Sequence, residues 1–271
     1  MTLIQSIILG IIQGATEFIP ISSSGHLVLA PYLFGWNIPP EETFVFDVLV
    51  QVATLIAVFA YFYNDIIKII SAFIKGIISK HPFTDYESKL GWFIIIATIP
   101  AGFVGLFIKK SVENAFNNPH MTSLFLIITG LFLALAEFIN KKSLHKNKLS
   151  VIDAIWMGIF QIFAIFPGIS RSGATITGGM LRKLERPYAA RFSFLMSIPV
   201  LLAAGILAIT DLFKIPNLND LVGIYFAGFF SAAIVGYISI KWLLSYLSKK
   251  PMYIFSLYCI VIGTIVFIKT I

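Results

Sequence analysis

Charged residues are scarce in this sequence. Only 12% of its 271 residues are charged, 20 basic and 13 acidic, whereas 58% are hydrophobic and the mean hydropathy is +0.90. Soluble domains carry about 25% charged residues, so the composition excludes an ordinary soluble domain. It predicts instead an all-α polytopic membrane protein that forms a single membrane domain over residues 1–271.

Cysteine is nearly absent, and basic residues are missing from the first part of the chain. The single cysteine, Cys259, excludes a disulfide or a thiolate metal site within one chain. The first Lys or Arg is Lys68, so a basic n-region is lacking and we expect no cleaved signal peptide. The net charge is +7, and the Lys and Arg residues that produce it lie between apolar segments, where they set the membrane topology. We therefore expect no nucleic-acid partner.

Two apolar stretches, 3–34 and 151–183, are interrupted by polar residues. In the first, the break Pro20–His26 leaves halves shorter than the roughly 20 residues that a crossing needs. The second stretch repeats the pattern, with its break at 167–173. We expect two re-entrant hairpins, each entering as a helix, turning at a polar tip and leaving as a helix. Such backbone is tolerated only inside protein or against a wet cavity.

The remaining apolar runs predict six transmembrane helices, and the Lys and Arg residues between them predict the topology. Fifteen of the 20 basic residues fall on one side of the membrane and four on the other, with Arg171 at a hairpin tip. The positive-inside rule makes the richer side cytoplasmic and puts both termini outside. The six spans are Phe46–Tyr63, Trp92–Ile108, Thr122–Ile139, Phe192–Thr210, Leu221–Leu247 and Tyr253–Ile268. The fifteen residues lie in 64–89, 141–148, 182–191 and 241–250, and the four are Lys109, Lys110, Lys214 and Lys269.

Hairpins that enter from opposite sides predict an inverted repeat, which a shift of 148 positions reveals in the sequence. Repeat one covers 1–140 and repeat two covers 150–271, each with one re-entrant hairpin and three transmembrane helices. In this alignment, Ser23 of repeat one takes the position of Arg171 in repeat two. Matching pairs are Gly10 and Gly158, Gln13 and Gln161, Ser22 and Ser170, Ser24 and Ser172, and Gly25 and Gly173.

The second tip, Pro167–Thr175, carries a guanidinium between hydroxyl groups. A charge at membrane depth is expensive and therefore a candidate functional site. We expect Ser172 to cap a helix that begins near Gly173, leaving N–H groups that bind an anion. Arg171 adds a planar guanidinium whose paired N–H donors fit phosphate oxygens. This predicts a phosphate pocket, with substrate contacts from Ser170, Ser172, Gly173 and Thr175.

The first tip supplies a carboxylate and candidate nucleophiles. Gln13 and Glu17 are one helical turn apart on the same face. We expect Glu17 and Arg171 to be the only deep carboxylate and cation, because Asp47, Glu137, Asp153 and the other acids lie near span ends or in loops. Neutral imidazole can deprotonate a hydroxyl or attack phosphorus itself. The remaining candidates for substrate binding or nucleophilic attack at this tip are Ser22, Ser23, Ser24 and His26.

Simpler interpretations stand beside these. Glu17 and Arg171 can form a purely structural ion pair, His26 can be a helix-start histidine bonded to backbone, and the serines can be caps only. Asp65–Lys80 is most simply an amphipathic helix that faces lipid and solvent. The residues alone fit either an enzyme acting on a lipid phosphate or a transporter or flippase for a phosphorylated lipid or small anion.

The two tips resemble the signatures of one known family. Gln13–His26 is similar to the first signature of the undecaprenyl-diphosphatase family of the bacitracin-resistance type, and Pro167–Thr175 with Gly178–Leu181 is similar to the second. The resemblance covers essentially the whole chain. It implies a phosphatase in a prokaryotic plasma membrane that converts a polyprenyl diphosphate to the monophosphate and phosphate. Such an enzyme recycles the lipid carrier for cell-envelope glycan synthesis, including peptidoglycan, and gives bacitracin resistance.

The same resemblance implies roles for the site residues. Glu17, Ser23, His26 and Arg171 carry over as the essential site, with Arg171 holding the diphosphate. Glu17 would bind a divalent cation, Mg²⁺ or Ca²⁺, or act as a base. Ser23 or His26 would be the nucleophile, or His26 would activate water. We expect the site to open to the outer face, and the oligomeric state is left open between a monomer and a homodimer.

This sequence departs from the family pattern at two positions. Many members have Glu where this chain has Gln13, which removes one metal carboxylate. Mg²⁺ held by one carboxylate and the substrate phosphates remains compatible with the sequence. Some members have an acid at the position of Arg191, where we expect the change to affect topology more than chemistry.

Overall fold

A computed structural model describes residues 1–116, 118–140, 146–212 and 218–271. In these ranges the protein consists of eleven helices without a strand, so the predicted all-α class is confirmed. The segment between the expected spans that end at Thr210 and begin at Leu221 lies mostly outside the described residues, and Lys141, Lys142 and Lys214 lie wholly outside them. The helices are α1 (Leu3–Phe18), α2 (Ser23–Phe34), α3 (Pro40–Tyr61), α4 (Tyr63–Ile78), α5 (Tyr86–Phe116), α6 (Pro119–Asn140), α7 (Val151–Phe163), α8 (Arg171–Leu181), α9 (Arg186–Leu212), α10 (Leu218–Leu247) and α11 (Tyr253–Lys269).

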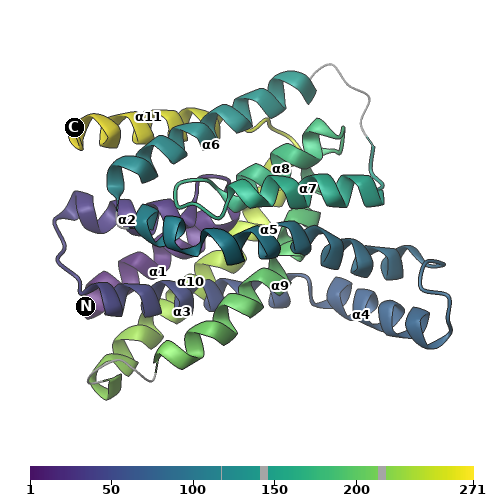
Figure 1. Ribbon diagram of the computed structural model, residues 1–271, viewed down its shortest axis with the longest axis horizontal. Coiled ribbons are helices and arrows are strands. Elements are labelled where there is room, and N and C mark those ends of the chain that lie inside the picture. Colours follow the sequence, from purple (N-terminus) through teal and green to yellow (C-terminus); the bar gives the residue numbers. More distant parts are fainter. Residues whose placement is uncertain (117, 141–145, 213–217) are drawn as a thin grey trace.

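Five of the described helices are long and apolar enough to cross a membrane, and they make the chain a multi-pass membrane protein. The sixth expected span is α11, whose 17 residues place it among the shorter apolar helices. Figure 1 shows both termini at the same end of the helix bundle. The five apolar segments are Glu42–Tyr61, Tyr86–Ile108, Pro119–Asn140, Arg186–Ile206 and Leu221–Leu247.

One helix runs further than its predicted span. The apolar span ends at Ile108 as expected, but α5 continues to Phe116, so residues 109–116 are also helical. Nothing in 109–116 breaks a helix, since that segment contains no Gly or Pro. The helix ends shortly before Pro119, which disfavours helical geometry at the residue preceding it.

Each interrupted stretch folds as a pair of short helices, which pack on different long helices. The pair α1 and α2 has 16 and 12 residues, and α7 and α8 have 13 and 11. α1 packs most extensively on α10, and α7 packs most extensively on α5. A Cβ on Gly10 would lie 2.2 Å from the carbonyl oxygen of Gly228, and a Cβ on Gly158 would lie 2.5 Å from that of Ala97. These two glycines therefore let helix backbones touch.

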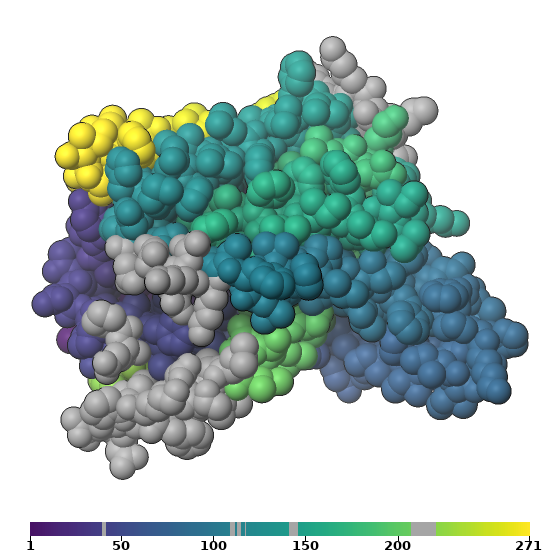
Figure 2. Space-filling view, in the orientation of Figure 1, coloured from purple at the N-terminus to yellow at the C-terminus, as the bar shows by residue number. Residues whose placement is uncertain are grey.

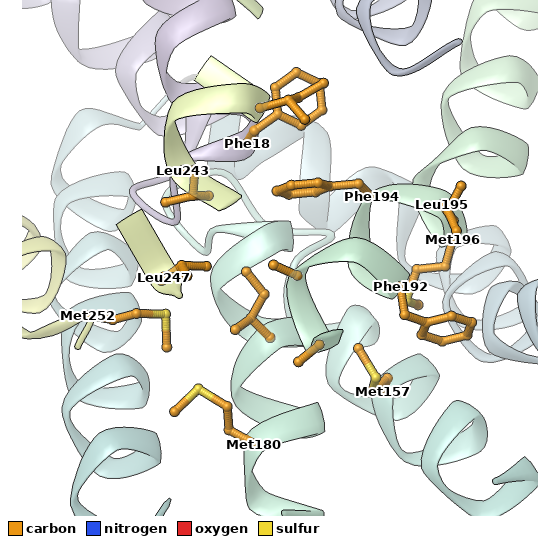
Figure 3. Close-up of a cluster of buried hydrophobic side chains, with 14 of the residues drawn as sticks. Phe18, Met157, Met180, Phe192, Phe194, Leu195, Met196, Leu243, Leu247 and Met252 are labelled. Atoms are coloured by element: carbon orange, nitrogen blue, oxygen red, sulfur yellow. The ribbon is translucent and has the colours of Figure 1, made fainter. Parts of the chain in front are cut away.

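Behind the polar tips lies a continuous apolar core. The Phe18 ring at the end of α1 meets the Phe194 ring of α9 edge-on, with centroids 5.2 Å apart. Figure 3 shows these two rings facing each other, with Met157, Met180 and Met252 among the other core side chains. Because Phe18 directly follows Glu17, this packing holds the end of α1 that carries Glu17 against α9.

The helix pair α4 and the start of α5 projects from the body of the molecule, as the blue region of Figure 2 shows. The predicted amphipathic stretch Asp65–Lys80 forms α4, which exposes isoleucines along one side. Arg191 of α9 pairs with Asp65 at 2.9 Å, and its guanidinium lies 5.4 Å from the centre of the Phe62 ring. The unusual Arg191 thus contacts the base of α4 and lies apart from the polar tips.

We expect the close helix contacts at Gly10 and Gly158 to limit stability. Valine at either position would push helix backbones apart, and overpacking of this kind costs about 1–3 kcal/mol or more. Gly10→Val and Gly158→Val should lower the thermal melting midpoint of the detergent-solubilised protein. Gly102→Val on α5 is the matched control, since a Cβ there meets nothing within 4 Å. Equal midpoints for all three variants would contradict this packing.

Candidate active site

The tip of the first hairpin is a strained serine turn. α1 ends at Phe18, and Ser22 caps α2 by accepting a hydrogen bond from the Gly25 N–H at 3.2 Å. Ser22 has φ +69°, a conformation that costs a non-glycine residue about 1–3 kcal/mol. Such strain persists only where the surrounding structure enforces it, so this tip is itself a candidate functional element.

The tip of the second hairpin is an unstrained counterpart. Ser170 has φ −67° and caps α8 by accepting from the Gly173 N–H at 3.0 Å. The Thr129 hydroxyl of α6 donates to the Gly168 carbonyl at 2.8 Å and accepts from the Ser170 N–H at 2.9 Å. Gly168 has φ +96°, and a Cβ there would lie 2.2 Å from the carbonyl oxygen of Thr122 on α6. Glycine is therefore required at position 168.

The predicted cap of this helix was wrong by two residues. Ser170, not Ser172, is the cap, and α8 begins at Arg171 instead of near Gly173. Since the Gly173 N–H donates to Ser170, that amide does not face an anion as expected. Arg171 is instead the first helical residue, and Ser172 is buried with its hydroxyl 3.1 Å from that of Ser170.

The two tips touch, and their functional side chains meet at Glu17. A Cβ on Gly25 would lie 3.0 Å from the Cα of Gly168. Glu17 Oε1 accepts from Arg171 Nη2 at 2.7 Å, and Oε2 accepts from the Ser23 hydroxyl at 2.5 Å. Oε2 also accepts from Gln13 Nε2 at 3.0 Å. The ion pair that the simpler interpretation anticipated is therefore formed, and a hydroxyl lies against its carboxylate.

This network is nearly closed. Glu17 is 6% exposed and Gln13 is fully buried, while the Arg171 side chain is 13% exposed. Arg171 Nη1 donates to the Ser193 carbonyl at 3.4 Å. The Thr175 hydroxyl donates to the Arg171 carbonyl at 2.8 Å and lies 2.6 Å from the Ser193 hydroxyl. Thr175 therefore links α8 to α9. We had expected this residue to contact the substrate.

His26 does not contact Ser23 or Glu17 through any hydrogen bond recorded for the described part of the chain. Its Nδ1 lies 2.7 Å from the Ser22 carbonyl oxygen, as the simpler interpretation anticipated, and its Nε2 lies 2.8 Å from the Tyr258 hydroxyl of α11. Sequence reasoning missed Tyr258, because it lies 232 positions away in a segment that looks like an ordinary apolar span. Ser24, also expected at the site, has its hydroxyl 3.5 Å from that of Ser22.

Glu17 is not the only buried carboxylate. Asp47 is 9% exposed, and its Oδ1 has no hydrogen-bond partner among the described residues. It lies near the start of the apolar span Glu42–Tyr61, as expected, yet it is buried, so Glu17 does not stand alone in this respect. Glu137 and Asp153 are also buried, but both are satisfied: Glu137 by Arg186 and the Met252 N–H, Asp153 by Lys146, Ser150 and Arg182.

The donor atoms at Glu17 fit a hard divalent cation in one limited way. Within the described ranges, no three or more His, Cys, Asp or Glu side chains are grouped to hold a metal. Gln13 Oε1, however, is buried without a hydrogen-bond partner next to the Glu17 carboxylate. Carboxylate and amide oxygens are ligands that Mg²⁺ and Ca²⁺ accept, and Mg²⁺ often uses one carboxylate with substrate phosphates.

Comparison with known proteins gives a consistent answer. The chain is 41% identical to an undecaprenyl-diphosphatase of Methanobrevibacter smithii, over 100% of this chain and 99% of that protein. It is 42% identical to an undecaprenyl-diphosphatase of Chloroherpeton thalassium, over 97% and 95% of the two chains. A third undecaprenyl-diphosphatase, from Moorella thermoacetica, is 39% identical over 98% of this chain and 97% of its own length. The family described as "Bacitracin resistance protein BacA" matches residues 6–265. Since that match contains both tips and nearly the whole chain, the protein belongs to the bacitracin resistance protein BacA family.

Proposed function

We propose that this protein is an integral membrane phosphatase that hydrolyses undecaprenyl or a related polyprenyl diphosphate to the monophosphate and phosphate. The observation that carries the proposal is the contact of Ser23, Glu17 and Arg171, in which one carboxylate accepts from a hydroxyl and pairs with a guanidinium. This contact supports the roles of Ser23 as nucleophile, Glu17 as its base and Arg171 as anion anchor. The names of the relatives, all undecaprenyl-diphosphatase, support the same substrate class.

Substrate binding exchanges the partner of Arg171. The guanidinium holds a carboxylate before substrate arrives, and its fork fits phosphate oxygens equally well. When a diphosphate replaces Glu17 as the partner of the guanidinium, the Glu17 carboxylate is free to accept a proton. The buried guanidinium keeps an anionic partner throughout, so its own charge stays compensated.

The first chemical step is attack of the Ser23 oxygen on the terminal phosphorus. The Ser23 proton passes to Glu17 Oε2, and a bond forms between Ser23 Oγ and phosphorus. The bond from that phosphorus to the bridging oxygen breaks, and its electron pair leaves with the polyprenyl monophosphate. Arg171 offsets the negative charge on the phosphoryl oxygens, which is the main requirement of phosphoryl transfer.

The second step is attack of water on the phosphoserine. The new oxygen–phosphorus bond replaces the bond to Ser23, whose oxygen regains the proton held by Glu17. One proton of the water stays on the released phosphate and the other is lost to solvent. The enzyme thus returns to its starting state.

A divalent cation, Mg²⁺ or Ca²⁺, belongs to this proposal as a partner of the substrate. Glu17 and Gln13 Oε1 would hold it, and it would supply positive charge next to the phosphate oxygens. The amide of Gln13 contributes no charge, so the ion depends on the single carboxylate and on the phosphates themselves.

The finer architecture is also part of the proposal. We infer an inverted repeat in which 3–34 and 151–183 are re-entrant hairpins. Ser22 and Ser170 make the same cap, and Gly10 and Gly158 make the same backbone contact on α10 and α5. The excess of Lys and Arg puts both termini outside, and the substrate reaches the site from the outer face. In this setting the enzyme recycles the carrier lipid of envelope glycans and gives bacitracin resistance.

A transporter or flippase of a phosphorylated lipid or small anion is the second candidate. The broken helices that meet at an ion pair favour it, since such helices form the binding sites of many transporters. It differs from the phosphatase in needing Arg171 without needing a nucleophile.

Arg171→Lys should reduce phosphate release strongly. Lysine keeps the positive charge beside Glu17 but loses the two-pronged contact with phosphate oxygens, and loss of one aligned donor costs roughly 10²–10³-fold in rate. We would measure phosphate release from a long-chain polyprenyl diphosphate in detergent, together with the melting midpoint as a check of folding. A folded Arg171→Lys protein with undiminished release would contradict the anchoring role.

Ser23→Ala should abolish phosphate release while leaving diphosphate binding intact, because it removes the nucleophile and keeps the anchor. Ser231→Ala is a matched control, since that hydroxyl donates to the Ala227 carbonyl within α10. Release by the control, with no release by Ser23→Ala, is the expected result. If wild type binds diphosphate but releases no phosphate with any divalent cation, the transporter becomes the better proposal.

Gln13→Glu should lower the Mg²⁺ or Ca²⁺ concentration that gives half-maximal activity, by about tenfold, because a second carboxylate raises the charge of the ligand set. Gln13→Leu, which removes the orphaned oxygen, should raise it. The measurement is activity against cation concentration in metal-stripped detergent solution. If neither variant moves the midpoint, the cation does not bind at Gln13.

A further inference from the structure

The protonation of His26 follows from its two hydrogen bonds. A carbonyl oxygen can only accept, so Nδ1, at 2.7 Å from the Ser22 carbonyl, carries the proton. In the neutral imidazole Nε2 is then the acceptor. Its partner is the Tyr258 hydroxyl at 2.8 Å, which therefore donates. Both nitrogens are engaged, and neither engagement is with Ser23 or Glu17.

Tyr258 holds this ring by stacking as well as by its hydroxyl. The two rings are within 11° of parallel, with centroids 5.6 Å apart. The neighbouring Cys259 thiol points at the Pro20 carbonyl oxygen, 3.9 Å away, as a weak second contact with the same tip. Two consecutive residues of α11 thus lie against the turn between α1 and α2.

The group that His26 holds is the strained part of this turn. Ser22, with φ +69°, directly precedes Ser23, whose hydroxyl lies 2.5 Å from Glu17. The hydrogen bond from His26 to the Ser22 carbonyl restrains the peptide that joins these two serines. The unstrained Ser170 of the second tip lacks this support, since Ala174 stands where the first hairpin has its histidine.

We propose that Tyr258 and His26 form a positioning pair that holds the Ser22–Ser23 peptide so that Ser23 faces Glu17. Tyr258 fixes the tautomer and plane of His26, and His26 Nδ1–H anchors the Ser22 carbonyl. His26 is then neither the nucleophile nor the base. The inference rests on the proposed function in that it takes Ser23 as the nucleophile.

Two isosteric variants of His26 separate positioning from chemistry. The amide nitrogen of asparagine takes the place of Nδ1, whereas that of glutamine takes the place of Nε2. His26→Asn should keep the Ser22 bond but lose the Tyr258 bond, so its kcat should fall about tenfold. His26→Gln and His26→Ala should lose the Ser22 bond, and a misplaced reacting group costs about a hundredfold. A folded His26→Asn protein as inactive as His26→Ala would overturn the proposal.

Tyr258 is tested through its dependence on His26. Tyr258→Phe keeps the ring and removes the donor, so kcat should fall about tenfold with KM unchanged. In the His26→Asn background, which lacks Nε2, the same change should have no further effect. Tyr32→Phe removes another hydroxyl between α2 and α11, which donates to the Lys269 carbonyl at 3.4 Å, and should leave kcat unchanged. Additive losses in the double variant would show that Tyr258 acts by another route.

A spectroscopic measurement tests the pair without any turnover. Imidazole ¹⁵N NMR of the full-length protein, with His26 identified by difference from His26→Asn, should show Nδ1 protonated and Nε2 accepting in wild type. Tyr258→Phe should change the Nε2 shift, whereas Tyr32→Phe should not. A proton on Nε2 in wild type would overturn the pair. If the NMR result holds but wild type releases no phosphate, the proposed phosphatase fails while the Tyr258–His26 arrangement stands.

Discussion

The ion pair between Glu17 and Arg171 is the interaction on which the rest of this structure depends. It joins two chain segments 154 positions apart at the place where the tips of the two pairs of short helices meet. A buried charge pair is tolerated only when the remaining lone pairs and protons are satisfied. Ser23 and Gln13 satisfy the carboxylate, and Ser193 satisfies the guanidinium. The polar residues of both tips can thus be understood as the surroundings that one buried pair requires.

Ending helices inside an apolar protein creates a second requirement, because the unpaired N–H groups of α2 and α8 have no water to bind. Ser22 and Ser170 meet it in the same way, each by accepting from the amide three residues later. The close approach of the tips meets the rest of this requirement. Gly25 lies against Gly168, and the Thr129 hydroxyl accepts from the Ser170 N–H. The tips are therefore rigid, and a rigid site can hold a hydroxyl against a carboxylate before any substrate arrives.

Much of this arrangement was predictable from the sequence. Hydropathy gave the long helices, and the breaks at Pro20 and Pro167 gave the two pairs of short helices, because apolar length and helix-breaking residues are local signals. The pairing of Glu17 with Arg171 was the simpler of the two interpretations that the sequence left open. The burial of Asp47 and the contact of Tyr258 did not follow. Both depend on which distant helix lies alongside, and nothing in the neighbouring sequence records that. The extension of α5, in contrast, agrees with the local sequence, since 109–116 contain no Gly or Pro. The cap at Ser170 instead of Ser172 depends on backbone torsions that two serines with the same side chain do not reveal.

The two tips are alike in backbone and unlike in chemistry, and this difference suits a diphosphate. In the proposed mechanism one tip offers a hydroxyl with its base and the other a fixed cation, and the substrate has a phosphorus to be attacked and oxygens to be held. If both tips carried arginine, no nucleophile would be present. If both carried serine, the buried Glu17 would lack its counterion. The strain at Ser22 falls on the tip that must aim an atom, whereas the tip that supplies only charge is relaxed at Ser170. Such a reaction needs strain only at the tip that brings an atom within bonding distance, because the other tip acts by electrostatic attraction alone.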